Sequence, residues 1–352
     1  MGGAALRHAA RPAAALAIAL VSAGSSVWLA SACSSPAPAP TEDAWTSAIG
    51  RDHPLAGRIY DVAAGAELDE RGLLEALSSA TFVLLGESHE NADHHRLQAR
   101  LVAGLAARGE APAVAFEMLR ADQQAALDEA QAAEPPTADG VRAATHWEEG
   151  GWPDFALYAP IFEAALAAGL PLVAADLDEA DRNRLASDGP LPPDLAARLG
   201  VEEPLPAALR AALERDLAAG HCGMLPASAM PRLVRVQRGR DAALAQALVE
   251  APGAPPDDAD PLAEEPIGVR AVLIAGAEHA RRDRGAPRAL ARIAPGADVA
   301  TVAFLEVDPG AKDLAADFAA RYGGEAVFDY AWYTPKASDE DPCERMRKHQ
   351  MR

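Results

Sequence analysis

The sequence predicts an α/β domain with a mostly parallel sheet flanked by helices, together with a helical insertion. Two observations lead to this prediction. Five short apolar runs lack the alternation of polar and apolar residues, which indicates strands that are buried on both faces. Segments with the apolar spacing of helices separate several of these runs, and alternation of strand and helix is typical of a parallel sheet.

Each expected strand ends beside a glycine or a carboxylate. The five runs cover residues 81–85, 113–116, 171–175, 271–275 and 299–305. Expected helices follow at 94–108, 121–130 and 157–168, with a further one at 232–248. Residues 181–250 show no strand pattern and are expected to form the helical insertion. Because parallel strands end at one edge of the sheet, the residues after these runs are expected to meet there.

The first 32 residues are predicted to be an export signal. Arg7 and Arg11 precede an apolar run at 13–21, and small residues lead up to Cys33. A basic start, a short apolar stretch and a small-residue cut site define such signals. Cleavage before Cys33 fits an ordinary signal peptidase, and it also fits lipidation of Cys33. We therefore expect a protein of the cell envelope, either lipid-anchored or periplasmic.

Residues 33–54 are predicted to form a Pro-rich tether, because closely spaced prolines give an extended spacer. The α/β domain is expected to span 55–335, and 336–352 is expected to be a charged tail. A further loose stretch is expected at 251–261. No stretch after the signal is apolar enough to predict a membrane-spanning helix.

Composition argues against a nucleic-acid partner and against two cysteine-rich classes of protein. The chain has 32 Lys and Arg against 52 Asp and Glu, a formal net charge of −20. Binding to a nucleic-acid backbone requires basic patches, so no nucleic-acid partner is expected. Only three cysteines occur, which excludes a disulfide-dense scaffold and a Cys-rich zinc module.

Candidate functional residues follow three of the expected strands. Glu87 and His89 come after the first strand, Glu117 after the second, and His279 after the fourth. Imidazoles and carboxylates together can bind a divalent metal or transfer protons. We expect His89, Glu117 and His279 to share one cleft, as metal ligands or catalytic residues, with Glu87 nearby as a base.

The other polar residues of this region are interpreted as structural. His94 and His95 stand at an expected helix start, where a capping or surface position is the simpler interpretation, and Asp93 is a plausible N-cap. Asp176 follows the third strand. Cys222 adjoins His221, which leaves two alternatives: a thiol nucleophile, or a disulfide with Cys343 if Cys33 is lipidated.

Several motifs together resemble the ChaN-like haem-binding uptake family of the Tiki superfamily. The first pair is Leu-Leu-Gly-Glu-Ser-His-Glu-Asn at 84–91 and Phe-Glu-Met-Leu at 116–119. Further matches lie at 221–226, 237–241, 275–279, 285–287, 333–335 and 341–343. One departure is the turn Gly-Ala-Glu-His at 276–279, which usually reads Gly-Asn-x-His in the family.

The resemblance implies an exported, often lipid-anchored protein of iron acquisition that binds haem. It implies cofacial haems at a homodimer interface and a tyrosine ligand, for which Tyr158 is our candidate, with His89 and His279 as alternatives. The wider superfamily includes metal-dependent peptidases and erythromycin esterases. The second hypothesis is therefore a hydrolase that uses His89, Glu117 and His279 with a divalent metal such as zinc. Whether the protein is an enzyme stays open, and an interaction module is the third alternative.

Overall fold

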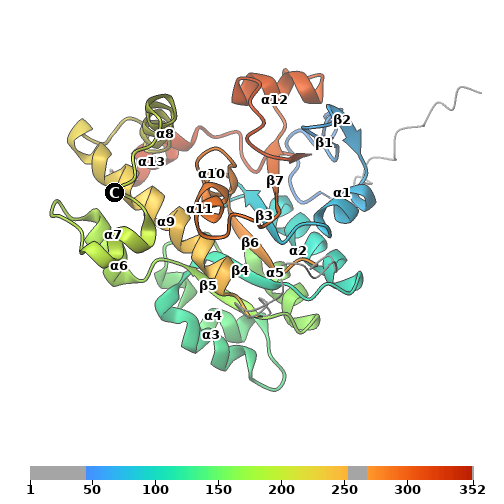
Figure 1. Ribbon diagram of the computed structural model, residues 1–352. Helices are drawn as coiled ribbons and strands as arrows, with labels where there is room; N and C mark the ends of the chain where they lie inside the picture. The colour runs from blue at the N-terminus through green and yellow to red at the C-terminus, as the bar shows by residue number, and fades with distance from the viewer. Residues whose placement is uncertain (1–44, 253–267, 351–352) are drawn as a thin grey trace, which may run out of the picture. The chain divides into compact units, whose positions relative to one another are not determined.

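A single mixed sheet forms the centre of the domain. The computed structural model describes residues 45–252 and 268–350, so the predicted signal, Cys33 and most of the tether lie outside the described residues. Within them, eight strands pair in the order β2-β1-β8-β7-β3-β6-β4-β5 (Figure 1). Strands β3 to β8 run parallel, and β1 and β2 are antiparallel at one edge. The strands are β1 Ile59–Asp61, β2 Ala66–Leu68, β3 Phe82–Glu87, β4 Ala113–Arg120, β5 Leu172–Asp176, β6 Ala271–Gly276, β7 Val299–Glu306 and β8 Tyr330–Thr334.

The α/β prediction is confirmed, and the five expected strands coincide with β3 to β7. Three further strands, β1, β2 and β8, were not predicted. Strands β1 and β2 have three residues each, and a pattern of period two cannot be recognised over so few positions. Strand β8 contains aromatic residues and a threonine instead of an aliphatic run.

Helices cover both faces of the sheet. One face packs against α1 (Glu70–Leu77), α2 (Ala92–Ala107), α3 (Gln124–Gln131), α4 (Ala138–Ala144) and α5 (Phe155–Ala167). The other packs against α9 (Met230–Glu250), α11 (Ala286–Ile293) and α12 (Leu314–Tyr322), as Figure 1 shows. Each face of the sheet buries a separate apolar cluster. As a result, all six residues of β3 and all six of β6 are buried. This burial on both sides explains their continuous apolar sequence.

Between β5 and β6 the described chain is helical, with α6 (Glu179–Ala186), α7 (Pro193–Leu199), α8 (Ala207–Gly220) and α9. Helix α9 crosses from these helices onto the sheet. Gly239 allows a close approach there, because a Cβ at this position would lie 2.4 Å from Cδ1 of Leu185 in α6. The next turn of α9 therefore reaches the edge where β4 to β6 end.

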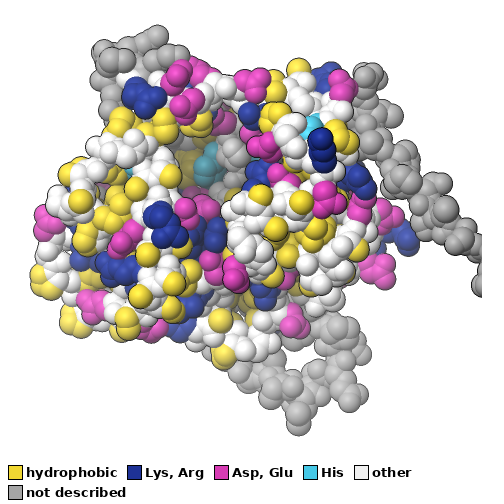
Figure 2. All heavy atoms as spheres, turned by 90° about the horizontal axis from the view of Figure 1, so that it is seen from above, with side chains coloured by type: hydrophobic (Ala, Val, Ile, Leu, Met, Phe, Trp, Pro, Cys, Tyr) yellow, Lys and Arg dark blue, Asp and Glu magenta, His cyan; other side chains and the backbone are white. Residues whose placement is uncertain are grey.

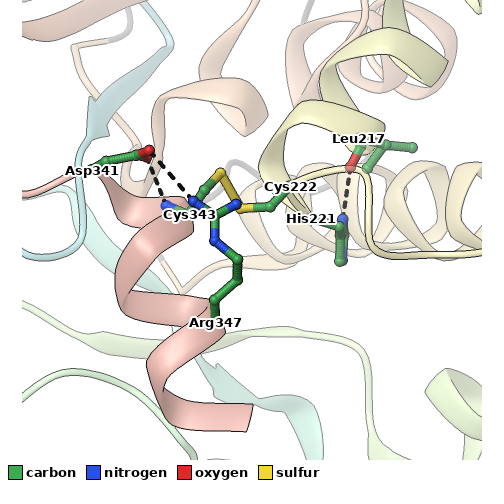
Figure 3. The surroundings of a disulfide bond; sticks show 6 residues. All are labelled: Leu217, His221, Cys222, Asp341, Cys343 and Arg347. Carbon is green, nitrogen blue, oxygen red and sulfur yellow. Dashed lines mark hydrogen bonds and ion pairs between the residues drawn. A yellow bond between two sulfur atoms is a disulfide. The ribbon is translucent and has the colours of Figure 1, made fainter. Parts of the chain in front are cut away.

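A disulfide joins Cys222, just after α8, to Cys343 in α13 (Pro342–Gln350), as Figure 3 shows. The backbone N–H of Cys343 donates to Oδ1 of Asp341 (2.9 Å). Nδ1 of His221 lies 2.7 Å from the carbonyl oxygen of Leu217. Cys222 thus has no free thiol, and part of the expected C-terminal tail is helical. No helix in the described ranges is long and apolar enough to cross a membrane.

Candidate functional site

Glu117 is the point at which the predicted site residues meet. It lies in β4 and is buried, whereas His89 follows β3 and His279 lies in α10 (Ala277–Ala280), directly after β6. Nε2 of His279 lies 3.3 Å from Oε1 of Glu117, and Nε2 of His89 lies 3.9 Å from Oε2. The parallel strands therefore bring both imidazoles to one carboxylate, in the arrangement expected from their positions after β3 and β6.

Glu87 fixes the orientation of His89. Nδ1 of His89 lies 2.8 Å from Oε1 of Glu87, and the hydroxyl of Tyr158 donates to the same oxygen at 2.8 Å. Burial acts to raise the pKa of Glu87, but His95 and His89 together hold it well below its usual range. Burial acts to lower the pKa of His89, but the hydrogen bond to Glu87 and the charges of Glu117 and Glu87 together raise it. Glu87 is thus an ionised, buried carboxylate beneath the imidazole.

His94 and His95 do not lie on the surface, contrary to our interpretation. Both are fully buried, and Nε2 of His95 lies 3.2 Å from Oε2 of Glu87. Asn91 is the N-cap of α2, because its side chain accepts the N–H groups of Asp93 and His94. Asp93 instead accepts the backbone N–H groups of Thr46 and Ser47. The start of α2 is therefore part of the packed interior.

Arg240 supplies the positive charge at this site and was not predicted. Its Nη2 donates to Oε1 of Glu117 at 2.8 Å, and its Nε and Nη2 donate to Asp176 at 2.9–3.0 Å. Burial acts to lower the pKa of Arg240, but Glu117 and Asp176 raise it. Its guanidinium also lies over the ring of Trp152, 5.9 Å from the centroid. The sequence signal was Arg240-Asp241 in the middle of an otherwise ordinary helix.

His279 is held as a cation between two carboxylates. Its Nδ1 lies 2.6 Å from Oδ1 of Asp241, which is buried in α9. Burial acts to lower the pKa of His279, but Glu117 and Asp241 raise it to about 10. Burial dominates at Asp241 and raises the pKa of that carboxyl. Both nitrogens of His279 are therefore engaged and protonated near neutral pH.

The expected metal set does not form. Among the described residues, no group of three or more His, Cys, Asp or Glu side chains has an arrangement that can hold a metal ion. Glu117 explains this, because Arg240 occupies Oε1 and the backbone N–H of Gly276 donates to Oε2 at 2.6 Å. With His279 also protonated, Arg240 and His279 already neutralise the carboxylates that a divalent cation would need.

His89 is the most accessible of these groups, with about 32% of its side chain exposed. Its ring packs edge-on against Trp152, with 5.1 Å between centroids. Its Nε2 makes no hydrogen bond within the described part of the chain. Gly276 leaves room beside it, because a Cβ there would lie 2.9 Å from Nε2. Figure 2 shows a hollow in the face seen from above, with histidine and charged side chains around it.

Tyr158 is completely buried in α5. Its hydroxyl donates to Glu87, and its ring lies 4.0 Å from that of His95. Burial and the charge of Glu87 raise the pKa of Tyr158 far above its usual value. The phenol is therefore protonated and enclosed, which differs from the exposed phenolate that an iron ligand requires.

The fold and the buried carboxylate–imidazole site define an α/β protein with a polar centre at the carboxyl edge of its sheet. A family model described as "Haem-binding uptake, Tiki superfamily, ChaN" matches residues 73–290, more than half of the chain. The chain belongs to this family. No curated protein sequence matches the chain significantly.

Several solved structures match the chain at low sequence identity. The chain is similar to ChaN of Campylobacter jejuni, a structure described as showing cofacial haem binding, with 18% identity and a TM-score of 0.59. That match covers 78% of this chain and 95% of the other. A mutant of the erythromycin esterase EreC matches with 16% identity, 78% and 95% coverage, and a TM-score of 0.42. The type III effector HopBA1 matches with 13% identity, 75% and 92% coverage, and a TM-score of 0.41.

Proposed function

We propose that this protein binds haem as part of haem or iron uptake and that His89 ligates the iron. Membership of the haem-binding uptake family supports the first part. The second part rests on one observation: His89 is a partly exposed imidazole whose Nδ1 is held by a buried carboxylate. Bound haem would supply the iron that such a protein retains or passes on.

The surroundings of His89 fit an axial ligand. Imidazoles that bind metals generally donate their other N–H to a carboxylate or carbonyl, which fixes the tautomer and makes the ligating nitrogen more basic. Glu87 has this role toward Nδ1, and Nε2 is the nitrogen without a hydrogen bond in the described residues. The missing side chain at Gly276 leaves space next to Nε2. Trp152, packed against the imidazole ring, offers apolar surface for a porphyrin.

The other predicted ligands have weaker support. His279 would have to lose a proton that two carboxylates stabilise, and Tyr158 would have to leave a buried hydrogen bond with Glu87. We therefore keep His89 as the ligand and interpret Tyr158 as the group that positions Glu87 and His89.

A haemin titration followed by visible absorption tests this proposal. Wild-type protein is expected to give a saturable Soret shift, and His89→Ala is expected to weaken binding at least about tenfold and change the spectrum. Tyr158→Phe is expected to retain a histidine-type spectrum. The matched control is His146→Asn, because His146 is 73% exposed and asparagine tolerates its positive φ. Normal haem binding by His89→Ala, or loss of the ligand spectrum only in Tyr158→Phe, contradicts the assignment.

We also propose that the protein is exported and anchored through a lipid on Cys33. The basic start, the apolar run and the small residues before Cys33 support this, as does the Pro-rich spacer that follows. Cys33→Ser is expected to move the protein from membrane fractions to soluble fractions. A wild-type protein that is already fully soluble contradicts the anchor.

A hydrolase is the second candidate function, favoured by the Glu87–His89 pair. A carboxylate that orients an imidazole by its Nδ1 prepares Nε2 to act as a general base toward water. Arg240, which donates to Glu117 in the same site, would stabilise negative charge in such a reaction. Turnover of carboxylic esters that disappears in both His89→Ala and Arg240→Gln would support this candidate, and absence of turnover in wild type would reject it.

A further inference from the structure

A second polar pocket is lined by residues of α9 and α11, the residues just before α11, and the chain at the end of α7 and just after it. Its volume is about 310 Å³. Four arginines line it, which is unusual in a chain with a net charge of −20: Arg238, Arg284, Arg288 and Arg292. No part of the haem proposal uses these residues.

Arg284 carries unsatisfied donors in this pocket. Its side chain is only 2% exposed, and its Nε and Nη1 have no hydrogen-bond partner among the described residues. Only Nη2 is engaged, with Asp216 and Glu278. A buried donor without a partner costs about 1–3 kcal/mol, and more for a charged group. The arrangement therefore points to an acceptor that completes the hydrogen bonding of Arg284.

The other three arginines keep their positive charges without a paired carboxylate. In the described ranges none of them forms an ion pair. Arg238 donates to the carbonyl oxygen of Gly200 at 2.9 Å, and Arg292 donates to that of Arg198 at 2.8 Å. These neutral carbonyls orient the guanidinium groups and do not neutralise them. Arg288 is exposed at the rim.

The charges around Arg238 include opposing groups. Burial lowers the pKa of Arg238, and Arg288 and Arg210 lower it further, whereas Glu203 and Asp241 act in the opposite direction. Asp241 is already paired with His279, and Glu203 forms no ion pair in the described residues. Four arginines and two acidic side chains, Glu203 and Asp241, line the pocket, and Asp216 and Glu278 pair with Arg284 without lining it.

The start of α11 adds a second feature that favours an anion. This helix has eight residues, its N-cap is Gly285, and no side chain caps it. Pro287 has no N–H and the N–H of Arg288 donates to the carbonyl oxygen of Gly285, so the helix start acts through its dipole. Gly285 lines the pocket. Helix starts carry partial positive charge and bind phosphate groups. Here that charge lies beside Arg284, the residue before Gly285, whose Nε and Nη1 remain unpartnered in the described residues while its Nη2 pairs with Asp216 and Glu278.

We propose that this pocket binds a small phosphate-bearing molecule through Arg284, Arg288 and Arg292. A phosphate presents several oxygens and up to two negative charges, so that more than one guanidinium can bind it, whereas a single carboxylate is satisfied by one bidentate arginine. The volume is at the lower end of ligand pockets, which run from about 300 to 1,000 Å³, and indicates a small ligand. The phosphate pocket is separate from the proposed haem site, and this proposal does not depend on haem binding.

The test is the stability of the full mature protein in increasing inorganic phosphate, at constant ionic strength set with chloride. We expect a saturable rise in Tm for wild type, since a ligand that binds only the folded state stabilises it. Arg288→Gln and Arg292→Gln, both at exposed positions, are expected to bind phosphate at least about tenfold more weakly, equivalent to about 1.4 kcal/mol. Arg71→Gln, an exposed arginine in α1, is the control and should respond as wild type does.

Three outcomes overturn the proposal. The first is an equal or unsaturable response in wild type and all variants, which indicates a general salt effect. The second is an equal response to acetate, which indicates a carboxylate site. The third is competition between phosphate and haemin, which would assign the arginines to haem propionates. Haemin binding that is unchanged in saturating phosphate, together with loss of the phosphate response in the two variants, supports it.

Discussion

The imidazole of His279 and the carboxylate of Asp241 form a buried pair, with 2.6 Å between Nδ1 and Oδ1. The two residues lie on α10 and α9, so the pair joins the end of β6 to the long helix that crosses the sheet. Glu117 contacts the other nitrogen of His279. This pair therefore ties the helical segment to the polar centre.

Asp241→Asn is expected to destabilise the protein by up to about 3–5 kcal/mol, because it leaves the buried charge of His279 with Glu117 as its one remaining carboxylate in the described residues, which Arg240 also contacts. Urea unfolding at neutral pH measures this change. Glu214→Gln is the control, since its partner Arg210 is exposed and such a helical pair contributes about 0.3–0.5 kcal/mol. A similar small effect for both variants would show that Asp241 does not stabilise a charged His279.

Gly276→Ala is expected to weaken haemin binding at least about tenfold while the protein stays folded. The new Cβ would lie 2.9 Å from Nε2 of His89, and His89 cannot turn away without losing its contacts with Glu87 and Tyr158. Haemin titration measures the affinity, and circular dichroism shows whether the variant stays folded. Gly296→Ala is the matched control, because no atom lies within 4 Å of a Cβ there. Equal haemin affinities in the two variants would remove His89 from the haem site.

His94 is expected to make the protein less stable in mild acid. The N–H of Ser88 donates to Nδ1 of His94, and Nε2 lies 2.8 Å from the hydroxyl of Thr334, so the neutral ring is the form that fits. Burial lowers the pKa of His94 to about 3. Because this pKa is below the unfolded value of about 6.5, the unfolded chain takes up the proton first as pH falls.

The resulting loss of unfolding free energy begins below about pH 6.5 and continues toward pH 3. It amounts to about 2 kcal/mol at pH 5, since each unit corresponds to 1.36 kcal/mol. Urea unfolding of wild type and His94→Asn between pH 7.5 and 5 measures it. The His94→Asn variant is expected to be less stable than wild type at pH 7.5. Its unfolding free energy is expected to fall less than that of wild type between pH 7.5 and pH 5. If the unfolding free energies of wild type and His94→Asn fell in parallel with pH, His94 would not be the cause of the acid sensitivity.

Removing the disulfide is expected to destabilise the fold by up to about 4–5 kcal/mol in the chain-entropy model. The bond closes a loop with a sequence separation of 121. Chemical unfolding of the Cys222→Ser and Cys343→Ser double variant measures the loss, and wild type under reductant should give a similar value. Two free thiols in unreduced, denatured wild type, besides any from Cys33, would contradict the bond.

The apolar runs predicted the central strands because β3, β4 and β6 are buried on both faces, so composition alone marks them. The same logic placed His89, Glu117 and His279 together, since residues after parallel strands meet at one edge. Arg240 and Asp241 could not be predicted in this way, because which face of α9 meets the sheet depends on packing between Gly239 and Leu185. The burial of His94 and His95 was missed for a related reason: sequence shows a helix start but not what packs on it.

The connection between Cys222 and Cys343 has a consequence for biogenesis. Cys343 follows β8, so all eight strands of the sheet in the described residues are synthesised before the second cysteine of the bond. The chain therefore cannot close this covalent link until all eight described strands have been synthesised. In the export that we propose, pairing of these cysteines would have to wait until α13 has crossed the membrane, so the bond would report that translocation has passed this helix.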